Sequence, residues 1–222
     1  MIAPETASTS ELTSTRDAIL DAAERRFAAR GFDGVSVREI TAAAGLKNQA
    51  SLYYHFAHKQ EIYEATLARG VDAIIQRLAE VAGAMPPTRD AAIVARDLDR
   101  VLDYLIDHPD IARLIQRAGQ DENSLVRGTV ARVVEPLYTL GVRVLANAGS
   151  PWTDDELPHV AAGLYHLIFG YFADASLLEA VLGEDLRGPA ALARQRQFLK
   201  AAVARLLGID PRTVTSEEGV RP

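Results

Sequence analysis

The chain has 222 residues, of which 48% are hydrophobic and 24% are charged; this balance excludes a disordered protein and allows a substantial core. It contains no cysteine, which excludes disulfides, thiolate zinc sites and cysteine nucleophiles and fits the reducing cytosol, so we expect a cytoplasmic protein. The net charge of −6 argues against indiscriminate binding to nucleic acid but leaves room for a local basic patch.

Hydrophobic residues recur with helical spacing along nearly the whole chain, and no segment alternates convincingly with the period of a strand. The predicted fold class is therefore all-α, with about nine helices separated by Gly and Pro. Residues 1–13 are polar and lack the features of a secretory signal, so we expect a flexible tail there. The first helix is predicted from about Thr15 to Arg30 and ends at Gly31.

A second helix is predicted from Val37 to Ala44. Ser36 and Glu39 have the spacing of a capping box, in which each side chain satisfies a backbone N–H of the other residue. Gly45 then supplies the left-handed backbone conformation that ends a helix. These signals predict a short helix followed by a tight turn.

The third predicted helix is capped by Asn48 and ends near Phe56. Leu52 and Phe56 share one face at 100° per residue and should point inward. The N-terminal tip and the opposite arc carry mostly polar side chains, namely Lys47, Asn48, Gln49, Ala50, Ser51, Tyr53 and Tyr54, with His55 at the margin. A short helix, a glycine turn and a second helix with a polar outer face indicate a helix-turn-helix, although an ordinary αα-hairpin is the alternative.

The chemistry of this outer face suits DNA. Gln can pair with adenine, Lys with guanine and Ala with a thymine methyl, while Tyr, Ser and His suit phosphate oxygens. Basic residues also outnumber acidic ones between Arg25 and Lys59, despite the negative net charge of the chain. We therefore expect a local positive surface on the N-terminal module.

Longer helices follow, predicted near 59–82, 89–107, 109–118, 122–148, 153–182 and 189–207. The contrast in helix length predicts a DNA-binding domain over 14–58 and a larger helical domain over 59–208, followed by a flexible tail over 209–222. The most apolar run, 160–173, is shorter than the roughly 20 residues of a membrane span, so we expect a buried helix and no membrane partner.

The histidines do not indicate a metal site or an enzyme. His55 and His58 have a spacing that could bind a metal, but no Cys exists and no carboxylate is obviously placed to complete the site. His108, His159 and His166 lack the accompanying Ser and Asp of a catalytic triad. We expect no metal, no cofactor and no catalytic residue.

The stretch VSVREITAAAGLKNQASLYYHFAHKQEIYEA, residues 35–65, resembles the DNA-binding signature of the tetracycline-repressor (TetR) family of transcriptional regulators. The shared features are Ala44-Gly45, Leu52-Tyr53, Phe56 and Lys59. Two features depart from the family pattern: Thr41 replaces a small Ala, and the turn after Gly45 is one residue longer. The longer turn leaves open which of Lys47 and Gln49 reads a base.

The resemblance implies a homodimeric repressor that a small, hydrophobic molecule releases from a palindromic operator in double-stranded DNA. It adds Ser36, Arg38 and Lys59 to the expected DNA contacts. Within the larger domain, the candidates for the ligand pocket are Tyr104, Arg117, Tyr138, His166 and Phe169, although aromatic stripes are more often core. The candidates for the dimer interface are Leu164, Ile168, Leu178, Val181, Phe198 and Leu199. An activator of the same fold and a helical protein–protein adaptor are the alternatives.

Overall fold

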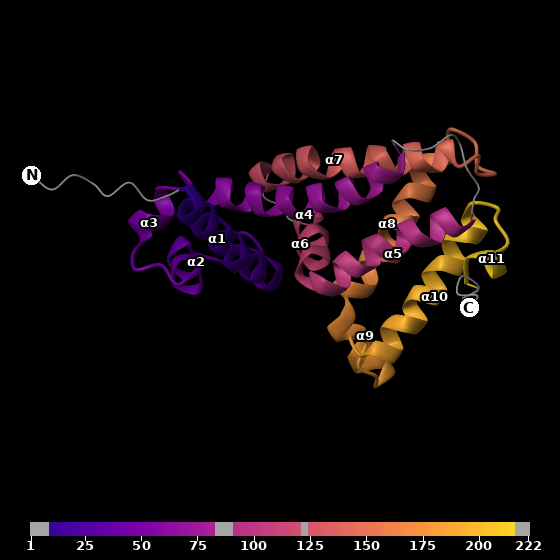
Figure 1. Cartoon of the computed structure of the whole chain (residues 1–222). Coiled ribbons are helices and arrows are strands. Elements are labelled where there is room, and N and C mark those ends of the chain that lie inside the picture. Colours follow the sequence, from indigo (N-terminus) through magenta and orange to yellow (C-terminus); the bar gives the residue numbers. More distant parts are fainter. Residues whose placement is uncertain (1–8, 83–90, 121–123, 216–222) are drawn as a thin grey trace, which may run out of the picture.

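A computed structural model describes residues 9–82, 91–120 and 124–215 of the chain. Every regular element within these ranges is an α-helix, which confirms the predicted all-α class (Figure 1). Eleven helices lie in the described ranges, where about nine were predicted for the chain. The additional helices come from the C-terminal part of the chain.

The N-terminal module consists of α1 (Thr9–Arg30), α2 (Val37–Ala43) and α3 (Gln49–Tyr53). Phe27, Ile40 and Leu52, one from each helix, are completely buried in a common hydrophobic core. The module forms one end of the elongated molecule, and α3 lies at its tip, away from the C-terminal helices (Figure 1).

The larger domain begins with α4 (Lys59–Ala82), which leaves the N-terminal module and packs along α7. Its remaining helices are α5 (Ala91–Asp107), α6 (Pro109–Gly119), α7 (Ser124–Asn147), α8 (Leu157–Ala173), α9 (Ala175–Leu182), α10 (Pro189–Leu206) and α11 (Pro211–Thr215). Figure 1 shows α9 and α10 at a corner of this domain distant from α3.

Two predictions about the C-terminal part are wrong. The segment predicted as one helix over 153–182 is two helices, α8 and α9, with a bend of 72° at Asp174. Both sides of the bend are apolar, so the hydrophobic pattern did not reveal it. The expected tail over 209–222 includes α11, whose Val214 is buried against the domain, whereas residues 216–222 lie outside the described ranges.

The expected N-terminal tail also differs from the structure, because α1 already begins at Thr9; residues 1–8 lie outside the described ranges. In the part of the chain that is described, no helix alone has both the length and the apolar character needed to cross a membrane. Only α8 and α9 taken together, across their bend, have that length and composition.

The two domains are joined by more than the continuous helix α4. Arg69 on α4 pairs with Asp21 at 2.8 Å and with Glu24 at 3.0 Å, both on α1. Helix α6 also packs against α1, and the Arg117 Nη1 donates a hydrogen bond to the Ala29 carbonyl at 3.0 Å. Helices α4 and α6 therefore both connect the N-terminal module to the larger domain.

Candidate nucleic-acid interface and ligand cavity

The start of α2 has the predicted capping box. The Glu39 N–H donates to Ser36 Oγ at 3.3 Å, and the Ser36 N–H donates to Glu39 Oε2 at 2.8 Å. The Ser36 backbone N–H and the neighbouring Arg30 guanidinium lower the pKa of the exposed Glu39 carboxyl to about 2. Ser36 is thus a helix cap, and its hydroxyl also donates to Glu39.

The turn between α2 and α3 depends on Gly45. Its φ of 71° is in the left-handed region, which side chains with a Cβ resist. The Gly45 N–H donates to the Ala42 carbonyl at 3.2 Å and the Leu46 N–H donates to the Thr41 carbonyl at 3.1 Å. This pair of bonds is a Schellman motif, which ends α2 and sets the direction in which α3 begins.

Helix α3 has one buried face and one face open to solvent. Asn48 caps the helix as predicted, since its Oδ1 accepts from the Ser51 N–H at 3.0 Å. Leu52 and Phe56 are buried, whereas Tyr53 is 47% exposed and Tyr54 is 73% exposed. The surface that the DNA-binding interpretation requires is therefore accessible.

The structure brings most of the predicted DNA contacts together at this tip. Lys47, Gln49, Ala50 and Tyr54 are exposed on and beside α3, and Arg38 is exposed on α2. Asn48 and Ser51 differ from these residues, because their side chains bond to each other as the cap of the helix at 3.2 Å. We expect both to position α3 more than to contact DNA.

The prediction that Lys59 binds phosphate needs correction. Its ammonium donates to the carbonyls of Phe32 and Val35, both at 3.0 Å, and lies 4.1 Å from the centroid of the Phe32 ring. Three short-range contacts inside the protein hold this charge. Lys59 therefore fastens the loop before α2 to the start of α4.

The two histidines near the turn have different surroundings. His58 Nδ1 accepts a hydrogen bond from the Glu61 N–H at 3.1 Å and so caps α4. Burial, followed by the charge of Arg16, lowers the pKa of His55.

Arg16 was not among the DNA contacts predicted from the sequence. Its guanidinium lies 5.1 Å from the centroid of the Phe56 ring, and its side chain is exposed beside α3. Arg16 lies far from the turn in sequence, so its position beside Phe56 became evident only from the packing of α1.

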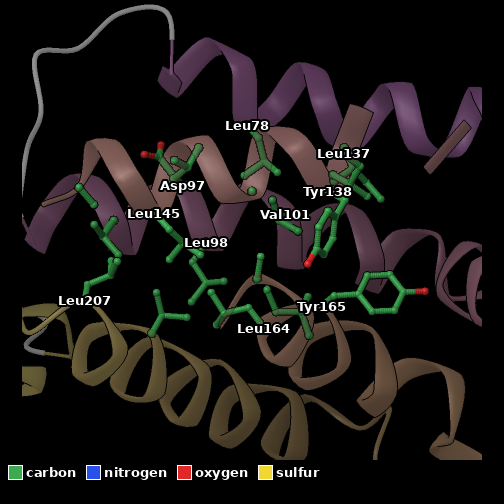
Figure 2. Close-up of a pocket in the computed structure, with 18 of the residues that line it drawn as sticks. Leu78, Asp97, Leu98, Val101, Leu137, Tyr138, Leu145, Leu164, Tyr165 and Leu207 are labelled. Carbon is green, nitrogen blue, oxygen red and sulfur yellow. The ribbon is translucent and has the colours of Figure 1, made fainter. Parts of the chain in front are cut away.

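The larger domain encloses a cavity of about 230 Å³ among α4, α5, α7, α8 and α10. Its wall is predominantly apolar and includes Leu78, Leu98, Val101, Leu137, Leu145, Leu164 and Leu207 (Figure 2). Among the side chains labelled in Figure 2, only those of Asp97, Tyr138 and Tyr165 carry oxygen. An apolar wall with few polar groups is typical of sites for small molecules.

Two of the five predicted ligand residues, Tyr138 and Phe169, line this cavity, and three do not. Tyr104 is buried outside the cavity wall, where the Arg77 guanidinium lies 4.3 Å from its ring centroid. Arg117 contacts the N-terminal module, and the His166 side chain is exposed. Successive residues of a helix are turned by about 100°, so Tyr165 lines the cavity whereas the adjacent His166 does not.

The sequence-based reasoning also missed Asp97, the charged residue of the cavity wall. It is 6% exposed, and burial raises its pKa, although Arg96 partly offsets this effect. A signal existed in the sequence: Val94, Leu98 and Val101 form the apolar stripe of α5, and Asp97 interrupts it.

The predicted dimer residues divide into three groups. Val181 and Phe198 are 71% and 52% exposed, and Leu178 is half-buried beside them. Leu164 and Ile168 line the cavity instead. Leu199 is completely buried within the chain, so its prediction as an interface residue is wrong. The exposed apolar surface, which we call the α9–α10 patch, also includes Leu177 and Leu182, which were not predicted.

Comparison with known proteins agrees with this arrangement. A family model described as bacterial regulatory proteins, tetR family, matches residues 19–66, which span most of α1 and all of α2 and α3. Over residues 19–66 the chain therefore matches the tetR family.

Curated relatives match a short part of the chain. The negative transcriptional regulator of the biofilm operon icaADBC, IcaR, from Staphylococcus epidermidis is 38% identical over 52 residues. The match covers 23% of the present chain and 28% of that relative. The same regulator from Staphylococcus aureus strain Newman is 40% identical over a match of the same length.

Solved structures share the fold over most of the chain. The fatty acid degradation regulator FadR from Bacillus halodurans has a TM-score of 0.64 at 14% identity, and the match covers 88% of this chain and 97% of that one. A TetR-like transcriptional regulator from Rhodococcus sp. RHA1 has a TM-score of 0.59 at 22% identity, covering 86% and 96%. The larger domain thus has the same overall fold despite the low identity.

Proposed function

We propose that this protein is a homodimeric, DNA-binding transcriptional repressor of the cytoplasm, released from its operator by a small apolar molecule. One observation carries the proposal: the face of α3 that matches the family's DNA-binding segment is open to solvent at the tip of the molecule. IcaR, which is 38% identical to this chain over 52 residues, is named a negative transcriptional regulator. This name favours repression over activation.

Helix α3 would enter the major groove with its N-terminal end, where Lys47 and Gln49 are exposed. A glutamine pairs with adenine through two hydrogen bonds, and a lysine pairs with guanine. Tyr54 at the C-terminal end of α3, Arg38 on α2 and Arg16 on α1 are also exposed and would contact phosphates, which position the helix without reading sequence.

The dimer would form through the α9–α10 patch. Large exposed apolar surfaces usually mark an interface, and Leu177, Val181 and Leu182 on α9 and Phe198 on α10 are each more than half exposed. A two-fold dimer places two copies of α3 on one side of the DNA. Its operator should then be a palindrome with half-sites about one helical turn apart.

The effector would act from the cavity. Helices α4 and α8 both contribute to its wall, α4 continues into the N-terminal module, and α6 packs against both α8 and α1. A ligand shifts the equilibrium between DNA-competent and incompetent dimers only by its difference in affinity for the two states. Arg69 and Arg117 join the larger domain to α1 through their contacts with the N-terminal module. These contacts would transmit the effect of the ligand to α3.

Selection from random duplex oligonucleotides with the purified full-length protein tests the proposal. We expect enrichment of a palindrome and loss of that enrichment with Tyr54→Ala, because Tyr54 is exposed and its truncation leaves the core intact. A protein that enriches no sequence at low salt would favour the adaptor alternative. In vitro transcription with the selected site overlapping a promoter then distinguishes repression from activation.

A further inference from the structure

Asp97 is the only charged side chain among the described residues that line the cavity. It lies on α5 between apolar residues that face the same space, and Figure 2 shows it at the wall near Leu98 and Leu145. Aspartate is almost never fully buried unless it is paired, and an apolar residue at this position would complete the stripe of α5. The carboxylate therefore requires an explanation.

Contacts within the protein do not fully satisfy the hydrogen-bonding capacity of the Asp97 carboxylate. Its Oδ2 atom is inaccessible to solvent and has no hydrogen-bond partner among the described residues. Its Oδ1 lies 3.4 Å from the Nε of Arg96, whose side chain is 57% exposed. A charge-assisted N–H···O bond is usually about 2.7–2.9 Å long, so this contact is weak. A buried charge that is only partly compensated lowers stability, and such groups often mark functional sites.

We propose that the cavity binds a small lipophilic cation, an apolar molecule whose protonated amine pairs with the Asp97 carboxylate. This inference rests on the proposed function, in which the cavity holds the effector. The leucine and valine side chains of the wall would bury the apolar part of the ligand, and the ammonium group would neutralise the one charge of the lining.

The charges around the cavity argue against an anionic ligand. Among the described residues, no Lys, Arg or His belongs to the lining, so a carboxylate in this space would lie near Asp97 without a counter-ion from these residues. Arg96 and Arg100 lie on the same helix, but both side chains are exposed and neither belongs to the lining. The Bacillus halodurans neighbour is named for fatty acid degradation; a free fatty acid does not suit the cavity of the present chain.

A chain-matched series of probes tests the ligand class. Octylamine, 1-octanol and octanoate carry the same apolar chain with a cationic, neutral or anionic head at pH 7. Their binding to the full-length protein is measured by isothermal titration calorimetry for the wild type, Asp97→Asn and Asp107→Asn. Asp107 is an exposed carboxylate on α5 outside the cavity lining, so its variant removes an equal charge from the same helix.

We expect the wild type to bind octylamine more tightly than the other two probes. Asp97→Asn should weaken octylamine binding about tenfold or more, because a hydrogen bond to a charged group is lost, and should leave octanol binding within roughly twofold. Asp107→Asn should behave as the wild type. The thermal unfolding transition of Asp97→Asn verifies that this variant is folded.

Three results would overturn the ligand class: equal octylamine affinity in the wild type and Asp97→Asn, tighter binding of octanoate than of octylamine, or no binding of any probe to the wild type. The proposed function is tested separately by adding octylamine to the complex with the selected operator. If octylamine binding depends on Asp97 while DNA binding is unchanged, the ligand class stands and the effector role of the cavity is rejected.

Discussion

Individual residues with the same charge have different roles at the tip of this molecule. Lys47 and Lys59 both belong to the segment that resembles the family signature, and both were expected to contact DNA. Lys47 is exposed beside α3, whereas the Lys59 ammonium is held by two carbonyls and an aromatic ring. Position in a motif therefore does not show which cation is available to a phosphate.

The two lysines give a matched pair of substitutions. Lys47→Ala should weaken binding to the selected operator and lower the slope of log K against log salt by about one, as expected for the loss of one cationic contact with DNA. Lys59→Ala should instead lower the free energy of unfolding by about 1–3 kcal/mol, because two carbonyl groups lose their donor. Fluorescence anisotropy across a salt series and urea denaturation measure the two effects.

An unchanged salt slope in Lys47→Ala would show that Lys47 does not contact DNA. A reduced slope in Lys59→Ala with unchanged stability would restore Lys59 as a phosphate contact and contradict its structural role.

Asp97 should make stability depend on pH in a direction opposite to that of a typical paired carboxylate. Its pKa is raised in the folded protein, because burial disfavours the charged form. Between the unfolded pKa of about 3.9 and the higher folded pKa, the folded state binds more protons, so stability falls as pH rises. Above the folded pKa this loss is complete.

We therefore expect Asp97→Asn to be more stable than the wild type at pH 7, with a difference that decreases as pH falls through the folded pKa towards 3.9. Thermal unfolding of the ligand-free protein from pH 3.5 to pH 7 measures this difference. A variant that is less stable at pH 7 would show that the charge of Asp97 is satisfied within the protein.

At the scale of the element, α3 illustrates how a very short helix is held in place. It contains only the residues Gln49–Tyr53, so its own hydrogen bonds contribute little stability. Its position depends on the Asn48 cap at one end, on the Gly45 turn before it, and on Leu52 buried beneath it. The capping and turn residues are thus as important for DNA recognition as the exposed face.

The Gly45 turn can be tested without steric complications. A Cβ at this position would meet no atom within 4 Å, so any effect of Gly45→Ala comes from the backbone conformation alone. We expect Gly45→Ala to lower the free energy of unfolding by about 1 kcal/mol, and Gly45→Asn to lower it less, because Asn adopts the left-handed region more readily. Urea denaturation followed by circular dichroism measures both. Equal stability of all three proteins would contradict the strained turn.

At the scale of the whole molecule, the apolar surface that remains exposed is concentrated at the corner opposite the DNA-binding tip. Figure 1 shows α9 and α10 there, and the bend after α8 places α9 beside the start of α10. The arrangement leaves α3 unobstructed when two copies join through the α9–α10 patch.

Val181→Glu should therefore convert dimers to monomers, because it places a charge in the middle of an apolar contact. Val181 is 71% exposed, so the substitution does not disturb the core of the chain. Sedimentation velocity measures the oligomeric state, and Ala131→Glu, at an exposed position of α7, is the control. A persistent Val181→Glu dimer would place the interface elsewhere. The monomer should also bind a single half-site more weakly than the dimer binds the palindrome.

Local signals in the sequence predicted the helical class, the Ser36–Glu39 and Asn48 caps, the Gly45 turn and the division of α3 into buried and exposed faces. Each of these depends on residues a few positions apart, so periodicity and spacing carry the information. Only the tertiary structure showed that Lys59 reaches Phe32, that Arg117 reaches Ala29, that Leu199 is buried and that Asp97 lines the cavity. These contacts join residues on different helices, and nothing in the local sequence of one helix specifies which face of another will pack against it.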